Sequence, residues 1–195
     1  MRWLAGVAAI IAAVVDILYF GIVIRQNSQG PRDPLGSTVV FVATFIAVLA
    51  VTAALAALRP ASALRPALLG LSAIGLLAIG VIAIFSIGLP LIVAGGLAFV
   101  ALLASLRESR QPAGVLKAGA GALLALAIFV GGFEATVRAI ACPATGVETG
   151  SGSGLVSGPY HYTCVNGKLT IYPGACNSGG ASYDANGNVT SVTTC

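Results

Sequence analysis

Residues 66–106 read PALLGLSAIGLLAIGVIAIFSIGLPLIVAGGLAFVALLASL, and this run contains no charged residue and no histidine. One straight helix over the whole run would be about 60 Å long, roughly twice the thickness of the hydrocarbon core of a bilayer. A run that crosses a membrane must therefore fold back on itself. Gly88-Leu89-Pro90 is the strong break near its middle, so we expect helices over about 67–87 and 90–106.

Apolar runs of spanning length also lie on both sides of this central segment. The first is Trp3–Ile24, which is longer than the roughly 7–15 apolar residues of a signal peptide and contains Asp16. We therefore expect a membrane helix over about 3–24 rather than a cleaved leader. Two further helices are expected over about 37–58 and 115–141, which brings the number of helices to five.

The composition indicates a lipid environment for most of the chain. Apolar residues make up 57% of the sequence and charged residues only 8%, whereas a soluble domain has about 25% charged residues. The predicted fold class is a membrane all-α protein, with a five-helix transmembrane bundle over 1–141. The net charge of +4 does not indicate a nucleic-acid partner, because the basic residues are scattered at the ends of apolar runs instead of clustered on one face.

Glycines recur within the predicted helices, where small residues allow helix backbones to approach closely in lipid. We expect them to pack the bundle against itself, and the alternative is a docking face for a partner subunit. They are Gly70, Gly75, Gly80, Gly95, Gly96, Gly119, Gly121, Gly131 and Gly132.

Five spans place the two ends of the bundle on opposite sides of the membrane. With the N-terminus in the cytoplasm, the inner side carries more basic residues than the outer side, as the positive-inside rule requires. The inner residues are Arg2, Arg59, Arg65, Arg107, Arg110 and Lys117, and the outer ones are Arg25, Arg32 and Arg138. We expect a multi-pass protein of the cell membrane with a cytoplasmic N-terminus and an extracytoplasmic C-terminus.

The tail after the last predicted helix has two segments of different composition. Residues 142–158 are rich in Gly and Ser and are predicted to form a flexible linker. Residues 159–195 are predicted to form a small β-hairpin domain outside the membrane, because Asn166-Gly167 separates two alternating segments. A two-residue turn there places Val165 opposite Lys168. A second hairpin is expected around Asn186-Gly187.

All the cysteines lie in this tail, at Cys142, Cys164, Cys176 and Cys195. An even number in a polar segment on the oxidising side of a membrane favours structural disulfides. Three pairings are possible, and we favour Cys142–Cys164 with Cys176–Cys195. No C-x-x-C motif is present, which argues against thiol redox chemistry.

No motif predicts catalytic residues, a metal site or a cofactor. His161 is the single histidine and lies in the tail, so the helices offer no histidine to ligate a haem. The sequence also lacks a G-x-S-x-G element and a Walker-type phosphate loop. A membrane enzyme, for example one with redox activity, is therefore the third of our hypotheses.

Charged side chains within the predicted spans are the remaining candidates for a site. Asp16 with Tyr19 lies in the first helix, and Glu134 with Arg138 lies one turn apart in the last. Such groups either form a structural cluster that fixes the helices or mark a relay or substrate site. We favour the structural cluster and expect a non-catalytic accessory or scaffold subunit that contacts the lipid bilayer and other membrane subunits. The alternative is a small transporter or channel that uses these residues.

Overall fold

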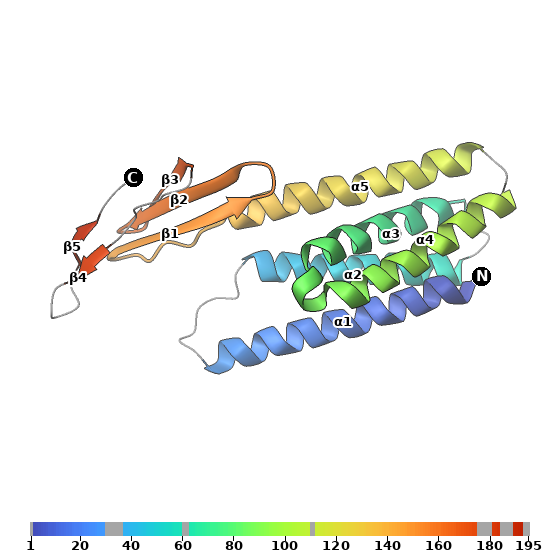
Figure 1. The fold of residues 1–195 in the computed structure, drawn as a ribbon, viewed down its shortest axis with the longest axis horizontal. Coiled ribbons are helices and arrows are strands. Elements are labelled where there is room, and N and C mark those ends of the chain that lie inside the picture. Colours follow the sequence, from blue (N-terminus) through green and yellow to red (C-terminus); the bar gives the residue numbers. More distant parts are fainter. Residues whose placement is uncertain are drawn as a thin grey trace. The chain divides into compact units, whose positions relative to one another are not determined.

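The computed structural model describes residues 2–29, 37–59, 63–109, 112–174, 181–183 and 189–192. The chain is mostly helical and divides into two compact units, Met1–Gly132 and Phe133–Cys195. Figure 1 shows its long helices, which are α1 (Arg2–Gln29), α2 (Ser37–Leu58), α3 (Arg65–Ile82), α4 (Leu89–Ser109) and α5 (Pro112–Val137). Within the described part of the chain, all five are long and apolar enough to cross a membrane. The five predicted helices are therefore confirmed as helices.

The α3–α4 connection differs in detail from the sequence-based expectation. Helix α3 ends at Ile82 instead of near residue 87, and a π-helical turn, η1 (Ile84–Gly88), joins it to α4. The Gly88 N–H donates to the Ala83 carbonyl at 2.8 Å, which is the i→i+5 bond of a π-turn. Pro90 is the second residue of α4, where its missing N–H leaves no helical hydrogen bond unmade. The run does fold back, and the turn begins earlier than expected, at residues that no charge or proline marks in the sequence.

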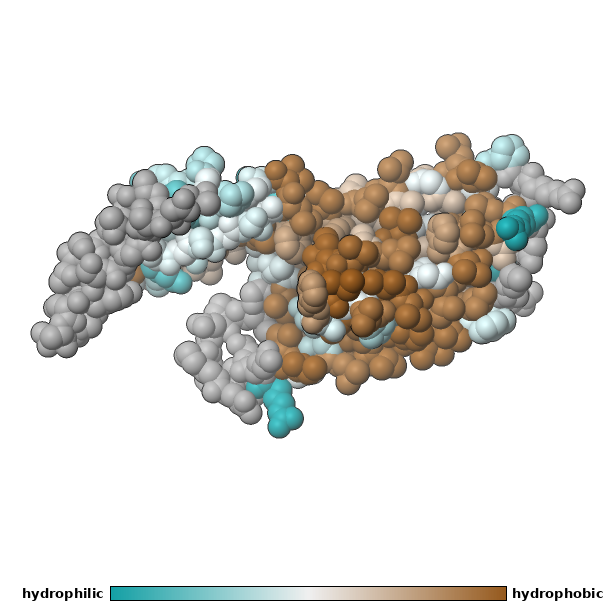
Figure 2. Space-filling model, viewed as in Figure 1, coloured by the Kyte–Doolittle hydropathy of each residue, from teal (hydrophilic) through white to brown (hydrophobic). Residues whose placement is uncertain are grey.

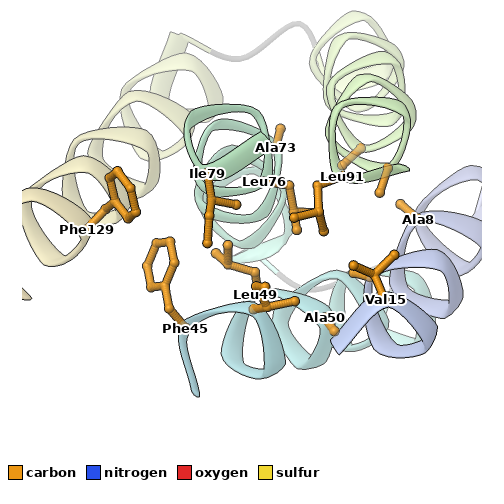
Figure 3. Close-up of a cluster of buried hydrophobic side chains, with 14 residues drawn as sticks. Ala8, Val15, Phe45, Leu49, Ala50, Ala73, Leu76, Ile79, Leu91 and Phe129 are labelled. Carbon is orange, nitrogen blue, oxygen red and sulfur yellow. The ribbon is translucent and has the colours of Figure 1, made fainter. Parts of the chain in front are cut away.

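Helices α1 to α4 form a ring in which each helix packs against the next and α1 packs against α4. Helix α5 contacts α2 through the rings of Phe129 and Phe45, which lie 5.5 Å apart. It contacts α3 through the glycines described below. Figure 3 shows the central cluster of buried side chains, to which all five helices contribute, including Val15, Leu49 and Leu91. The interior of the ring is filled mainly by aliphatic side chains, with alanine prominent among them.

The apolar side chains of this unit also cover its outer surface. Leu116, Ile17 and Leu123 are 76%, 71% and 69% exposed. Figure 2 shows hydrophobic residues over the visible face of the helices. Soluble monomers rarely expose apolar patches larger than a few hundred Å², so this surface is unusually apolar for a protein in water.

The helical glycines divide into two groups. A Cβ added at Gly70 would meet the Ala118 carbonyl, and one at Gly121 would meet the Ala67 carbonyl, so α3 and α5 touch through their backbones. Gly75, Gly80, Gly95 and Gly132 are also in close contact with neighbouring helices or turns, whereas Gly96, Gly119 and Gly131 have no atom within 4 Å. Most of these glycines therefore serve packing within the bundle.

The second unit contains a three-stranded antiparallel sheet, formed by β1 (Val147–Gly154), β2 (Gly158–Val165) and β3 (Lys168–Pro173) in that order. The predicted register is confirmed, since Val165 pairs with Lys168 and Tyr162 with Ile171. Strands β4 (Ala181–Tyr183) and β5 (Val189–Val192) pair as a second antiparallel ribbon. The predicted turn at Asn186-Gly187 lies outside the described residues.

Strand β1 lies within residues 142–158, where the sequence predicts a flexible linker. Gly150 pairs with Tyr162 and Gly152 with Tyr160. A Cβ at Gly150 would lie 2.5 Å from the Tyr162 ring, so the glycines leave the space that the tyrosines of β2 occupy. Glycine has a poor intrinsic preference for strands, and here the cross-strand aromatic contacts outweigh it.

The predicted Cys142–Cys164 disulfide is present, with the two Cα atoms 5.4 Å apart. Cys164 is fully buried on the same face of β2 as Tyr160 and Tyr162. Cys176 and Cys195 lie outside the described residues, so their pairing stays a prediction.

Candidate functional site

The densest group of polar contacts in the second unit joins the end of α5 to the turn between β1 and β2. We call this group, made of Glu134, Val137, Arg138, Val156 and Tyr160, the α5–sheet junction. Glu134 Oε1 lies 3.2 Å from Arg138 Nη2, and Glu134 Oε2 accepts a hydrogen bond from the Val156 N–H at 3.3 Å. The carboxylate thus contacts a cation on its own helix and a backbone amide of the hairpin.

Neighbouring residues leave room for this carboxylate. A Cβ added at Gly154 would collide with the Glu134 carboxylate and with the Ser157 hydroxyl. The Ser157 hydroxyl lies beside the same carboxylate, but Ser157 Oγ has no hydrogen-bond partner among the described residues. The glycine at the end of β1 is therefore what allows the hairpin to approach α5 so closely.

Tyr160 makes the second polar contact of the junction. Its hydroxyl donates to the carbonyl of Val137, the last residue of α5. The final carbonyls of a helix have no partner within the helix, and this hydroxyl supplies one of them. Tyr160 is 8% exposed, so the hydrogen bond is largely shielded from solvent.

The segment after α5 is fastened to the sheet at two further places. The Cys142–Cys164 disulfide is the first. At the second, the Asn166 N–H donates to the Gly146 carbonyl at 2.9 Å, and the Gly146 N–H donates to Asn166 Oδ1 at 3.1 Å. The helix end, the segment and the sheet are thereby linked by one covalent and several hydrogen bonds.

The predicted group of four intramembrane side chains falls into two pairs. Glu134 and Arg138 form the ion pair described above, in the second unit. Asp16 and Tyr19 lie on α1 in the first unit, and both are partly buried. Asp16 Oδ1 is buried and has no hydrogen-bond partner among the residues that the structure describes. That Asp16 joins Glu134 and Arg138 stays a prediction.

The sheet presents aromatic side chains on both faces. The rings of His161 and Tyr172 stack with centroids 5.0 Å apart, and Tyr172 is 40% exposed. On the opposite face, burial, and then the nearby charge of Glu148, raise the pKa of Tyr162. The His161–Tyr172 stack therefore lies on the face of the sheet opposite to Tyr162, with the Tyr172 ring partly exposed.

Sequence reasoning found Glu134, Arg138 and the disulfide, but it missed Val156 and Tyr160. The one available signal was the apolar pair Leu155-Val156, which is unusual in a hairpin turn.

Within the described part of the chain, no three His, Cys, Asp or Glu side chains are grouped closely enough to hold a metal ion. The contacts at the α5–sheet junction, an ion pair and hydrogen bonds, hold the end of α5 and the β1–β2 hairpin together.

Comparison of the chain with known protein families, with curated proteins and with solved structures gives no match.

Proposed function

We propose that this chain is a multi-pass membrane protein whose five helices span the bilayer, with the N-terminus in the cytoplasm and the sheet outside the cell. Support comes from the apolar outer surface of the helices. Basic residues also gather at the ends where α2 meets α3 and α4 meets α5, namely Arg59, Arg65, Arg107 and Lys117. Lys117 Nζ donates to the Ala63 carbonyl at 3.2 Å, which brings the start of α5 to the α2–α3 connection. This is the distribution expected of a cytoplasmic side.

Within that frame, we propose a non-catalytic accessory or scaffold subunit that displays its sheet as an interaction module. The observation that carries this proposal is the α5–sheet junction, in which Glu134 is bound by the Val156 N–H and by Arg138. A carboxylate held in this way stabilises a connection and is poorly placed to release and rebind protons or ions. The same contacts hold the sheet firmly at the end of α5, as a display module requires.

Site-specific photo-crosslinking in native membranes tests this proposal. A photoreactive phenylalanine analogue replaces Tyr172 on the sheet or Phe99 on α4, two aromatic residues that are both 40% exposed. After mild-detergent extraction, we expect the Tyr172 position to crosslink one protein that also co-purifies stoichiometrically. A crosslink from Phe99 alone would assign the contact to the helices instead, and a clean monomer without any crosslink would contradict the proposal.

A small transporter or channel is the second candidate, and it is favoured by Asp16. An unpartnered carboxylate oxygen within a membrane helix is costly, and such groups commonly mark ion or proton paths. In reconstituted vesicles this function predicts a pH-dependent ion flux that Asp16→Asn abolishes and Glu134→Gln leaves largely intact. Absence of flux from folded protein would remove this candidate.

A further inference from the structure

We propose that the turn between β1 and β2, residues Leu155-Val156-Ser157, is embedded in the lipid interface beside the last turn of α5. The sheet would then be held at the membrane by an apolar tip as well as by the chain that leads to it. The inference rests on the membrane placement proposed above and adds a lipid-binding element to it.

The position of the turn along α5 is fixed by its contact with Glu134. The Val156 N–H lies 3.3 Å from Glu134 Oε2. Glu134 precedes the end of α5 at Val137 by three residues, about 4.5 Å along the helix axis. The apolar span extends to Val137. The tip of the hairpin therefore lies alongside the final turn of the span and not beyond it.

The residues of this turn suit lipid better than water. Leu155 and Val156 are 43% and 74% exposed, whereas turns in water favour Gly, Asn, Asp, Ser and Pro. The other end of β2 provides an internal comparison, because its turn is Asn166-Gly167, followed by the exposed Lys168. At about 3.3 Å per residue, the eight residues of β2 separate the two turns by roughly 23 Å. One strand thus has an apolar turn at α5 and a polar turn far from it.

Three polar groups around the tip have partners within the protein, which favours an apolar environment, whereas Ser157 Oγ is buried without a hydrogen-bond partner among the described residues. The Val156 N–H is bound by Glu134, and the Glu134 carboxylate is balanced by Arg138. The Val137 carbonyl receives the Tyr160 hydroxyl. Tyrosine is also one of the residues enriched where membrane and water meet. The junction can therefore enter the interface without leaving these groups unpartnered.

Tryptophan quenching by lipid measures the depth of the turn. The chain has one tryptophan, so Trp3→Phe provides a silent background. Single tryptophans are then placed by Val156→Trp at the turn, by Leu124→Trp at an exposed position of α5 and by Lys168→Trp at the far turn. The full chain is reconstituted in phosphatidylcholine vesicles with brominated acyl chains. We expect quenching and a blue-shifted emission at positions 124 and 156, and neither at position 168.

The three positions separate two kinds of failure. Quenching at 124 without quenching at 156 would overturn the embedded turn and leave the membrane placement intact. An unquenched position 124 would instead overturn the membrane placement itself.

Tryptophan has its own preference for interfaces, so a second readout uses the unsubstituted turn. In phosphatidylcholine nanodiscs with spin-labelled lipid, the methyl NMR signals of Val156 should broaden. Those of Val165, which is 45% exposed near the far turn, should stay sharp. Equal sharpness of the two sets would overturn the proposal.

Discussion

Glu134 illustrates how a single charged residue near the end of an apolar helix is stabilised by its surroundings. Its carboxylate has two partners of different strength. The ion pair with Arg138 is exposed on the arginine side, and exposed pairs contribute little because solvent screens them. The hydrogen bond from the Val156 N–H is made to a charged acceptor, and such bonds are stronger than those to a neutral acceptor. The hairpin contact should therefore matter more than the helical ion pair.

Substitutions at both positions separate these contributions. Glu134→Ala should release the hairpin and speed hydrogen exchange at the Val156 amide, because the amide loses its charged acceptor. Arg138→Gln, which removes only the ion pair, should change that exchange much less than Glu134→Ala does. Hydrogen exchange on the detergent-solubilised full chain measures both. Unchanged protection in Glu134→Ala would show that the carboxylate does not hold the turn.

Tyr162 gives the sheet a dependence on alkaline pH. Burial raises its folded-state pKa above the ordinary value of 10.0, and the charge of Glu148 adds to the shift. The tyrosine of the unfolded chain ionises near pH 10.0, before that of the folded sheet. The stability of the folded sheet is therefore fully present below pH 10.0, and part of it is lost as the pH rises through the folded-state pKa. The difference in tyrosinate absorbance between the wild type and Tyr162→Phe should show an ionisation above that value. An ionisation at or below it would contradict the prediction.

At the scale of elements, the α3–α5 contact depends on the absence of side chains. Gly70 and Gly121 each face a backbone carbonyl of the other helix, whereas Gly119 on α5 faces open space. The two glycines of α5 therefore form a matched pair for substitution by alanine.

Gly121→Ala should lower the thermal unfolding midpoint in detergent, because its Cβ would collide with the Ala67 carbonyl. Gly119→Ala should leave the midpoint unchanged or raise it, because alanine is favoured over glycine in a helix by about 1 kcal/mol. If the two variants shift the midpoint equally, α3 and α5 do not touch at these positions.

Pattern and composition predicted the elements whose signals are local. Apolar runs predicted all five helices, and Asn166-Gly167 predicted both the turn and the register of β2 with β3. The limits of α3 could not be predicted, because the π-turn at Ile84–Gly88 has Ser86 as its single polar side chain and no charged residue, Asn, Asp or Pro marks where it begins. Strand β1 could not be predicted either, because its partner supplies the aromatic rings that stabilise it.

In the candidate site, too, the contacts that could be predicted are those between residues close together in the sequence. Glu134 and Arg138 are one helical turn apart, so their pairing could be predicted from sequence spacing alone. The contacts of Val156 and Tyr160 with α5 join residues more than 20 positions apart along the chain. No periodicity or motif reports such contacts, which follow from the length of the segment between α5 and β1 and from the register of the hairpin.

At the scale of the whole molecule, the disulfide is the covalent fastening between the segment after α5 and the sheet. It closes a loop with a sequence separation of 22 residues. For a loop of about this length, the loss of chain entropy in the unfolded state is equivalent to about 3 kcal/mol. A domain of this small size has too little core to dispense with that contribution.

The double variant Cys142→Ser/Cys164→Ser should therefore lose protection from hydrogen exchange throughout β1, β2 and β3. The helical circular dichroism signal should persist, because the core of the bundle involves none of these residues. Loss of the helical signal in the same variant would show that the bundle depends on the sheet for its stability.

The place of Cys142 and Cys164 in the chain has a consequence for the order of events during synthesis. Both thiols follow α5, so they are made only after all five helices have been synthesised. In the proposed topology they reach an oxidising compartment only once the fifth helix has crossed the bilayer. Formation of this bond would then report that insertion is complete, and a cell could distinguish finished from stalled molecules by the oxidation state of a single pair of sulfur atoms.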